Sequence, residues 1–222
     1  MIYVYHSYRD RGVNLFVQDT PFDNIVNLSL NLRNTSDIAG ILIKLREQLI
    51  QDNTAEETAI IDVIVPKLRP GHWIHGPRTV VHVMNEKVDW NDFSLIGSIF
   101  TSELNKLCIN TVTGGLTVGI VTYDFDNRHL VDKIIKERSS VSDCKIEGCD
   151  IDGSYSVEYP VVIVVHGVSF DDDIPALYLE ISRARVYCVI ILYTFHLDSI
   201  SENQYVASLL DKLEDTVKIV RH

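Results

Sequence analysis

Cysteine is scarce in this sequence: four residues in a chain of 222 show no disulfide framework, which favours a reduced setting. Long apolar runs are missing as well, since no stretch approaches the ~20 consecutive apolar residues of a membrane-spanning helix. The N-terminus lacks a basic segment followed by a long apolar run, so secretion is not expected. These absences predict an intracellular protein, cytoplasmic or nuclear, with no membrane partner.

Basic side chains are also in short supply. The chain carries 20 Lys and Arg against 31 Asp and Glu, a net charge of -11. Proteins that bind nucleic acid by themselves usually have a basic face, because phosphate neutralisation supplies much of the affinity. A solvated acidic surface is therefore favoured. Nucleic-acid binding by the isolated chain is possible but weak; the basic residues that lie close in sequence, Arg9 with Arg11 and Lys133 with Lys136 and Arg138, could form local basic patches.

The usual phosphate-binding and metal-binding patterns are missing too. The chain has no Gly-x-x-x-x-Gly-Lys-Ser/Thr segment, and Gly114–Gly115 precedes a predicted strand, whereas a phosphate loop joins a strand to a helix. No apolar strand ends in the Asp-Glu pair that would hold Mg²⁺. His72, His75 and His82 lack a regularly spaced fourth ligand, so a packed loop is favoured over a metal centre. We expect no metal site.

What the sequence does contain is a repeated alternation of strands and helices. Short, β-branched apolar runs are typical of strands buried on both faces, and apolar stripes at helical spacing lie between them. Strands are predicted at 25–32, 60–65, 79–84, 116–123, 144–151, 161–166 and 186–193, and helices at 36–51, 90–108, 202–220, after 126–127, and between 176 and 185. This pattern predicts a three-layer α/β domain with a mainly parallel sheet and helices on both faces.

The chain is long enough for one sizeable core. Residues 1–24 are polar and mixed, so we interpret them as a lead-in segment, and residues 25–222 as a single domain with a loop and strand insertion at about 66–88. Within the insertion, the prolines and glycines of Leu68–Pro77 argue against a regular element.

Three segments resemble motifs of superfamily 1 helicases of the UvrD/Rep type. Ala176–Arg185 is similar to motif VI, whose usual form is Leu-Tyr-Val-Ala-Leu-Ser/Thr-Arg-Ala, and Tyr155–Ile163 is similar to the preceding Gly-Leu-Glu-Phe-Pro-Val-Val motif. Leu30–Thr35 is similar to motif IV, Leu-x-x-Asn-Tyr-Arg-Ser. The segments occur in the family's order. The resemblance implies the second, C-terminal RecA-like domain of such an NTPase.

The resemblance also implies a set of site residues. Arg33 and Arg183 match the arginines that reach the nucleotide from this domain and meet charge developing on the γ-phosphoryl group, so both are candidate catalytic residues. Glu158 matches the glutamate near the nucleotide sugar or phosphates. Taken without the resemblance, Arg33 could be an exposed helix-start residue, Glu158 a surface carboxylate, and Arg183 a partner of Glu180 or Asp173 on a solvated face.

The sequence departs from the family in ways that limit its activity. The P-loop domain is absent, Ser156 stands where the family has glycine, and the lysine of that motif is missing. We therefore expect no ATP hydrolysis by the chain alone, and ATP with Mg²⁺ only where a P-loop ATPase domain is supplied in cis or in trans. The prediction is the C-terminal half of a helicase-like ATPase; the alternative is a catalytically inert protein-interaction module derived from one.

Overall fold

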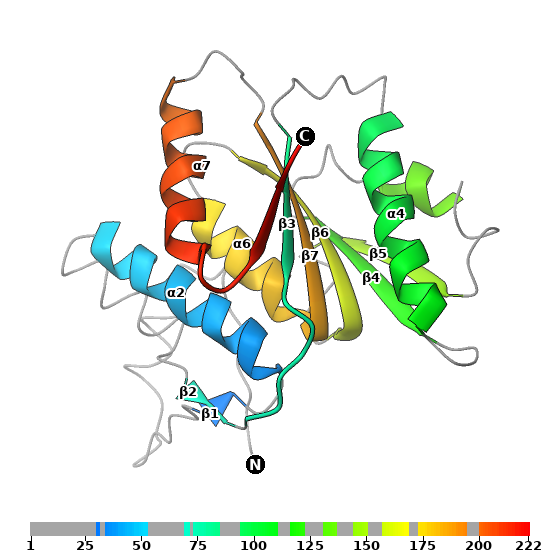
Figure 1. The fold of residues 1–222 in the computed structure, drawn as a ribbon, viewed down its shortest axis with the longest axis horizontal. Helices are drawn as coiled ribbons and strands as arrows, with labels where there is room; N and C mark the ends of the chain where they lie inside the picture. Colours follow the sequence, from blue (N-terminus) through cyan, green and yellow to red (C-terminus); the bar gives the residue numbers. More distant parts are fainter. Residues whose placement is uncertain are drawn as a thin grey trace, which may run out of the picture.

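A six-stranded parallel sheet forms the centre of the molecule, with strand order β5-β4-β6-β7-β3-β8 (Figure 1). The computed structural model describes residues 30–31, 34–52, 69–71, 73–84, 94–110, 116–122, 131–136, 144–150, 157–168, 173–194 and 200–222. The strands are β3 (Val80–Val83), β4 (Thr117–Thr122), β5 (Lys145–Asp150), β6 (Tyr159–Val168), β7 (Ala184–Thr194) and β8 (Lys218–Arg221). A separate parallel pair joins β1 (Leu30–Asn31) to β2 (Arg69–Pro70).

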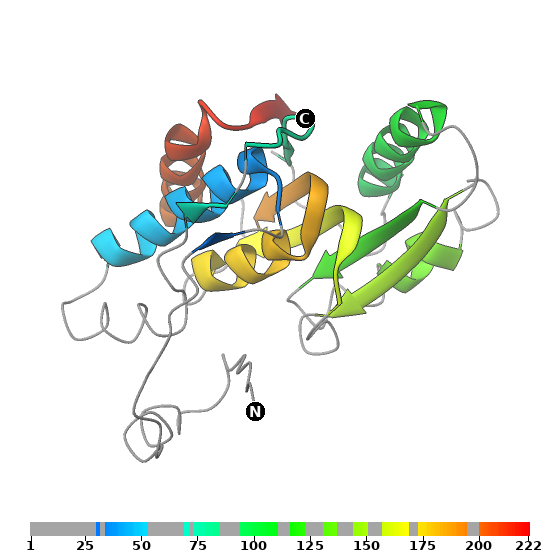
Figure 2. The same cartoon turned by 90° about the horizontal axis from the view of Figure 1, so that it is seen from below.

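Helices cover both faces of the sheet. They are α2 (Ser36–Asp52), α4 (Ser94–Asn110), α6 (Asp173–Ser182) and α7 (Ile200–Leu213), with a further helical segment at 131–136. Helices α2, α6 and α7 pack on one face and α4 and 131–136 on the other (Figure 1). Figure 2 shows α2 running between α6 and α7, both of which it contacts. The predicted three-layer α/β architecture, with helices on both faces of a parallel sheet, is confirmed.

The two central strands explain why their sequences are almost wholly apolar. Along β6, Val162 and Val164 face α2 and α6, while Ile163 and Val165 face α4, and all four are fully buried. A strand covered on both faces has no solvent side to make polar, so it forms a continuous apolar run. The predicted strands at 161–166 and 186–193 are therefore confirmed as the inner strands β6 and β7.

The predicted C-terminal helix is too long. It ends at Leu213, whose carbonyl oxygen accepts hydrogen bonds from the amides of Thr216 (2.8 Å) and Val217 (3.0 Å). The chain then forms β8, which pairs with β3. Buried Val217 continued the apolar spacing of the helix by coincidence, whereas the β-branched residues from 216 to 220 favour a strand.

Two other expectations concern the segment around residue 70. The proline- and glycine-rich stretch was expected to contain no regular element, but Arg69–Pro70 forms the minimal strand β2. Within the proposed insertion, β3 lies between β7 and β8, and its Val81 and Val83 belong to the core. Residues 1–29 and the strand predicted at 60–65 lie outside the described residues. In the described part of the chain, no helix is long and apolar enough to cross a membrane.

Replacing Gly119 by alanine should destabilise the fold. A Cβ at this position in β4 would lie 2.5 and 2.6 Å from Cγ and Cε2 of Tyr159, so the buried ring would have to move. Overpacking of this kind costs about 1–3 kcal/mol of unfolding free energy, measurable by urea denaturation. The control is Gly97→Ala in α4, where the new methyl meets nothing within 4 Å and should stabilise by about 0.5–1 kcal/mol. Equal effects of the two substitutions would contradict the close approach at Gly119.

Candidate functional site

A β-bulge at the start of β7 shapes the amino-terminal edge of the sheet. Tyr159 pairs with Ala184 and Val161 with Tyr187, so two residues of β7, 185 and 186, stand opposite the single residue 160 of β6. Bulges interrupt the alternation of side chains and re-aim them. In keeping with this, both bulge residues of β7 point to solvent. Proline is compatible with position 160, because prolines in sheets occur at strand starts and bulges.

The carbonyl groups of this bulge are held by the residues that begin α2. The Asn34 side-chain amide donates to the carbonyl oxygen of Ala184. The Thr35 amide donates to Arg185 (3.0 Å), and the Thr35 hydroxyl donates to Val186 (3.4 Å). Asn34 and Thr35, which immediately precede α2, therefore bond to a distant strand, and three consecutive backbone acceptors fix the helix start against β7.

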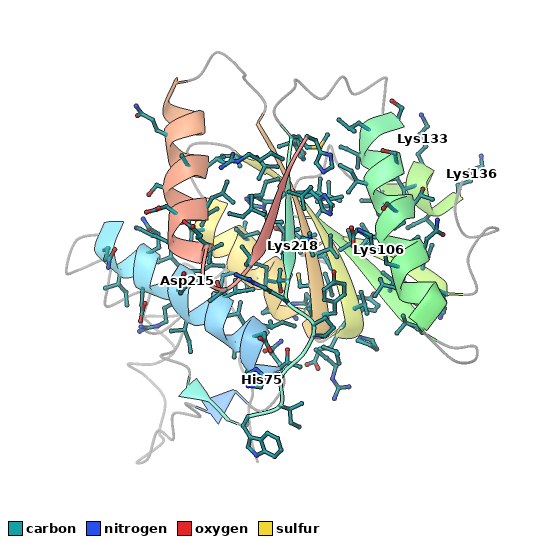
Figure 3. All side chains as sticks on the ribbon, viewed as in Figure 1. His75, Lys106, Lys133, Lys136, Asp215 and Lys218 are labelled. Atoms are coloured by element: carbon teal, nitrogen blue, oxygen red, sulfur yellow. The ribbon has the colours of Figure 1, made fainter. Side chains whose placement is uncertain are left out.

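A loop at 73–79 is fixed to the same helix start. The Ser36 amide and hydroxyl both donate to the carbonyl oxygen of Ile74, at 2.9 and 3.1 Å. The Asp37 carboxylate accepts from the Gly76 amide (2.8 Å) and lies 3.2 Å from Nδ1 of His75, beside the first turn of α2 (Figure 3). A Cβ on Gly76 would lie within 3.0 Å of the Thr35 hydroxyl, so this close approach requires glycine.

The loop and the bulge together expose apolar side chains at this edge. Trp73 is 85% exposed, Ile74 56% and Val186 45%. Among the described residues, these three are the large hydrophobic side chains that are exposed. The carbonyl groups of Ile74 and Val186 are hydrogen-bonded to Ser36 and Thr35 at the start of α2, which fixes the backbone at these two positions.

Arg183 lies at the C-terminal end of α6 and is 6% exposed. Its Nε donates to the carbonyl oxygen of Leu179 (3.2 Å), and its own carbonyl oxygen accepts from the Tyr159 amide (3.0 Å). A cation at a helix C-terminus satisfies the last carbonyl groups and the helix dipole. The alternative that placed Arg183 and Glu180 on a solvated face is wrong, since both side chains are buried.

Glu158 immediately precedes β6 at the same edge and lies beside Arg185. Its Oε2 is 3.8 Å from Nε of Arg185, which is a loose ion pair. The Glu158 side chain is 24% exposed and that of Arg185 is 59% exposed. In the motif resemblance, Arg185 is only the last residue of the segment similar to motif VI and has no assigned role. The feature of the sequence that points to Arg185 is the Arg183-Ala184-Arg185 spacing, which places a second arginine two residues after the motif arginine.

Arg33 lies outside the described residues. Its neighbour in sequence, Asn34, donates to the carbonyl oxygens of Ser182 (3.3 Å) and Ala184, the two residues on either side of Arg183. Asn34, the residue after Arg33, therefore contacts Ser182 and Ala184, the residues before and after Arg183.

A buried polar pair supports α6 from within the core. Nδ1 of His166 on β6 lies 2.7 Å from Oε2 of Glu180, and both side chains are almost completely enclosed. Neither residue of this pair is among the site residues predicted from the sequence. The available signal was a lone histidine at the end of an apolar strand and a lone glutamate in an apolar helix. The pair links β6 to the helical turn that precedes Arg183.

A second polar cluster lies on the opposite face of the sheet. Nε2 of His82 is 3.2 Å from the Glu103 carboxylate, and its Nδ1 is 2.8 Å from Nε2 of His222. Lys106 of α4 (Figure 3) pairs with the same oxygen of Glu103. His82 satisfies both partners in either protonation state: the neutral ring donates to Glu103 and accepts from His222, and the charged ring donates to both.

No group of three His, Cys, Asp or Glu side chains in the described residues could hold a metal ion. His75 is exposed at the start of α2, whereas His82 is buried in β3 and bonded to Glu103. His72 lies outside the described residues.

No protein-family model matches the chain, and no curated protein matches it. A solved structure with a similar fold is the C-terminal domain of a possible DNA helicase from Lactobacillus plantarum. It has 13% sequence identity and a TM-score of 0.49, over 84% of this chain and 97% of that chain.

The His82 cluster should make stability depend on pH. Burial lowers the pKa of His82 below its ordinary value of 6.5, with Glu103 opposing and His222 and Lys106 adding to the shift. The unfolded chain therefore takes up this proton first, and stability is lost as pH falls below about 6.5. His82→Gln should remove up to about 1 kcal/mol per pH unit from the slope of unfolding free energy between pH 6.5 and 5.

The measurement is urea denaturation at a series of pH values. Between pH 7.5 and 8.5 the two chains should give parallel profiles, which serves as the internal control. An unchanged slope below pH 6.5 in His82→Gln would show that His82 is not the group responsible.

Proposed function

We propose that this chain is the arginine-supplying half of a superfamily 1 helicase-like ATPase, and that a P-loop domain in cis or in trans completes the ATP site. The observation that carries the proposal is the convergence of the three motif-like segments at one edge of the sheet. Asn34 bonds to Ser182 and Ala184, and Tyr159 bonds to Arg183. These contacts between the first motif-like segment and the last, about 150 residues apart in sequence, support the proposal.

The chemistry of the edge suits a phosphate ligand. Guanidinium groups stay charged and form paired hydrogen bonds with phosphate oxygens. In the proposed site, Arg33 and Arg183 meet charge that develops on the γ-phosphoryl group, and Glu158 lies near the nucleotide sugar or phosphates. The P-loop domain would hold ATP and Mg²⁺, because this sequence has neither the phosphate loop nor the Asp-Glu pair for that task.

The exposed apolar side chains of the same edge support a partner domain. Val186 follows Arg185 in β7, and the loop that carries Trp73 and Ile74 is bonded through Ser36 to the same start of α2. Clustered exposed apolar groups mark interaction surfaces, and tryptophan and arginine are enriched at the centre of protein interfaces. A P-loop domain that covers this edge would bury these groups and bring a nucleotide to the arginines.

A second function fits one observation. The Arg183 guanidinium is enclosed, and its Nε already bonds to the Leu179 carbonyl. An arginine that holds the end of a helix in this way would be expected in a catalytically inert module that uses the same apolar edge to bind a protein partner. Nucleic-acid binding by the chain alone is the weakest of the three, given the net charge of -11.

Substitution of Arg183 separates the two functions. In a complex with its P-loop domain, Arg183→Ala should lower the ATP hydrolysis rate by on the order of 10³-fold or more, as for other arginines that meet the transferred phosphoryl group. Arg183→Lys should also be slow, because an ammonium cannot form the paired hydrogen bonds. ATP binding by the P-loop domain should change little.

The matched control is Arg221→Ala, at the carboxyl end of β8 and therefore at the opposite edge of the parallel sheet. It should leave hydrolysis unchanged. Thermal unfolding of each variant establishes that the domain is still folded. Full hydrolysis by a folded Arg183→Ala complex would reject the ATPase proposal in favour of the inert module.

A further inference from the structure

The two arginines of the 183–185 turn have opposite surroundings. Arg183 is 6% exposed and its Nε is bonded to Leu179. The Arg185 side chain is 59% exposed because the bulge turns it outward. Arg183, which matches the arginine of motif VI, is thus buried, whereas Arg185, to which the motif assigns no role, is accessible to a ligand.

The base of the Arg185 side chain is held firmly. Its carbonyl oxygen accepts from the Thr35 amide at 3.0 Å, and the carbonyl groups of Ala184 and Val186 are bonded to Asn34 and to the Thr35 hydroxyl. Three consecutive backbone positions are therefore fixed, while the guanidinium group extends into solvent. Fixing the base of a flexible cation lowers the entropy cost of binding an anion.

The ion pair between Arg185 and Glu158 is weak enough for another anion to replace the carboxylate. At 3.8 Å the Nε and Oε2 atoms are too far apart for a hydrogen bond, and half-exposed ion pairs of this kind contribute little. A phosphate oxygen could take the place of the carboxylate and form shorter, paired hydrogen bonds with the guanidinium.

We propose that Arg185 is a phosphate-binding residue, and that Glu158 is its counter-ion until a polyphosphate displaces it. The choice of ligand rests on the proposed function, since the polyphosphate would be that of a nucleoside triphosphate. The assignment itself depends on the bulge, the exposure of Arg185 and the loose pair with Glu158. In this arrangement Arg183 holds the α6–β7 turn, and Arg185 makes the first contact with the anion.

The test uses the whole chain, labelled with ¹⁵N, and sodium tripolyphosphate as the probe at low ionic strength. NMR detects each arginine Nε–H group, and Arg185→Lys identifies the Arg185 signal by its loss. We expect a saturable shift of the Arg185 signal, while the Arg183 signal stays in place because its Nε donates to Leu179.

Variants then fix the roles of the two side chains. Arg185→Gln should weaken tripolyphosphate binding about tenfold or more, as expected for loss of a charge-assisted bidentate contact. Glu158→Gln should tighten it by up to about fivefold, the worth of an exposed ion pair. Arg221→Gln, which removes the same charge at the opposite edge, should change it less than twofold.

Absence of a saturable Arg185 shift would overturn the inference, as would equal losses in Arg185→Gln and Arg221→Gln, which would indicate a general charge effect. An unchanged affinity in Glu158→Gln would overturn the counter-ion role. These results are independent of the proposed function. If Arg185 binds tripolyphosphate but the Arg183→Ala complex hydrolyses ATP normally, the anion site is supported and the ATPase proposal is rejected. If Arg185 does not bind tripolyphosphate but Arg183→Ala abolishes hydrolysis, the ATPase proposal is supported and the anion site is rejected.

Discussion

The structure of this edge depends on the contact between the start of α2 and the bulged start of β7. Asn34 and Thr35 supply three donors to three consecutive carbonyl groups of β7. Buried backbone acceptors are costly when left without a donor, so a bulge packed under a helix needs such donors. This contact fixes α2, and through Ser36 and Asp37 it also fixes the loop that carries Trp73.

This contact places the candidate site at an unusual position for an α/β sheet. Ligands of open parallel sheets commonly bind beyond the carboxyl ends of the strands. Here the polar and exposed groups gather at the amino-terminal ends of β6 and β7, where the C-terminus of α6 and the start of α2 also meet. Arg183 satisfies the end of α6 from within the protein, whereas the bulge leaves Arg185 exposed. Arg183 and Arg185, two residues apart, therefore differ in their surroundings: the first is bonded within the protein and the second is exposed to solvent.

Periodicity alone predicted most of the fold, because burial on both faces gives β6 and β7 continuous apolar sequences and α2 a regular apolar stripe. It failed at β8, where Val217 happened to continue the spacing of α7. It could not predict the bulge, since register depends on how two strands pair and not on either sequence alone. Glu158 and Arg183 came from motif resemblance, which gives residue identity but not exposure, and so it did not distinguish enclosed Arg183 from exposed Arg185.

Hydrogen–deuterium exchange at the Thr35 amide tests this central contact most directly. The account predicts strong protection, comparable with amides inside α2, because the Thr35 amide donates to the Arg185 carbonyl at 3.0 Å. It also predicts that Asn34→Ala lowers this protection while the amides of β6 keep theirs. Exchange of the Thr35 amide at the rate of an unprotected peptide in the unsubstituted chain would contradict the account.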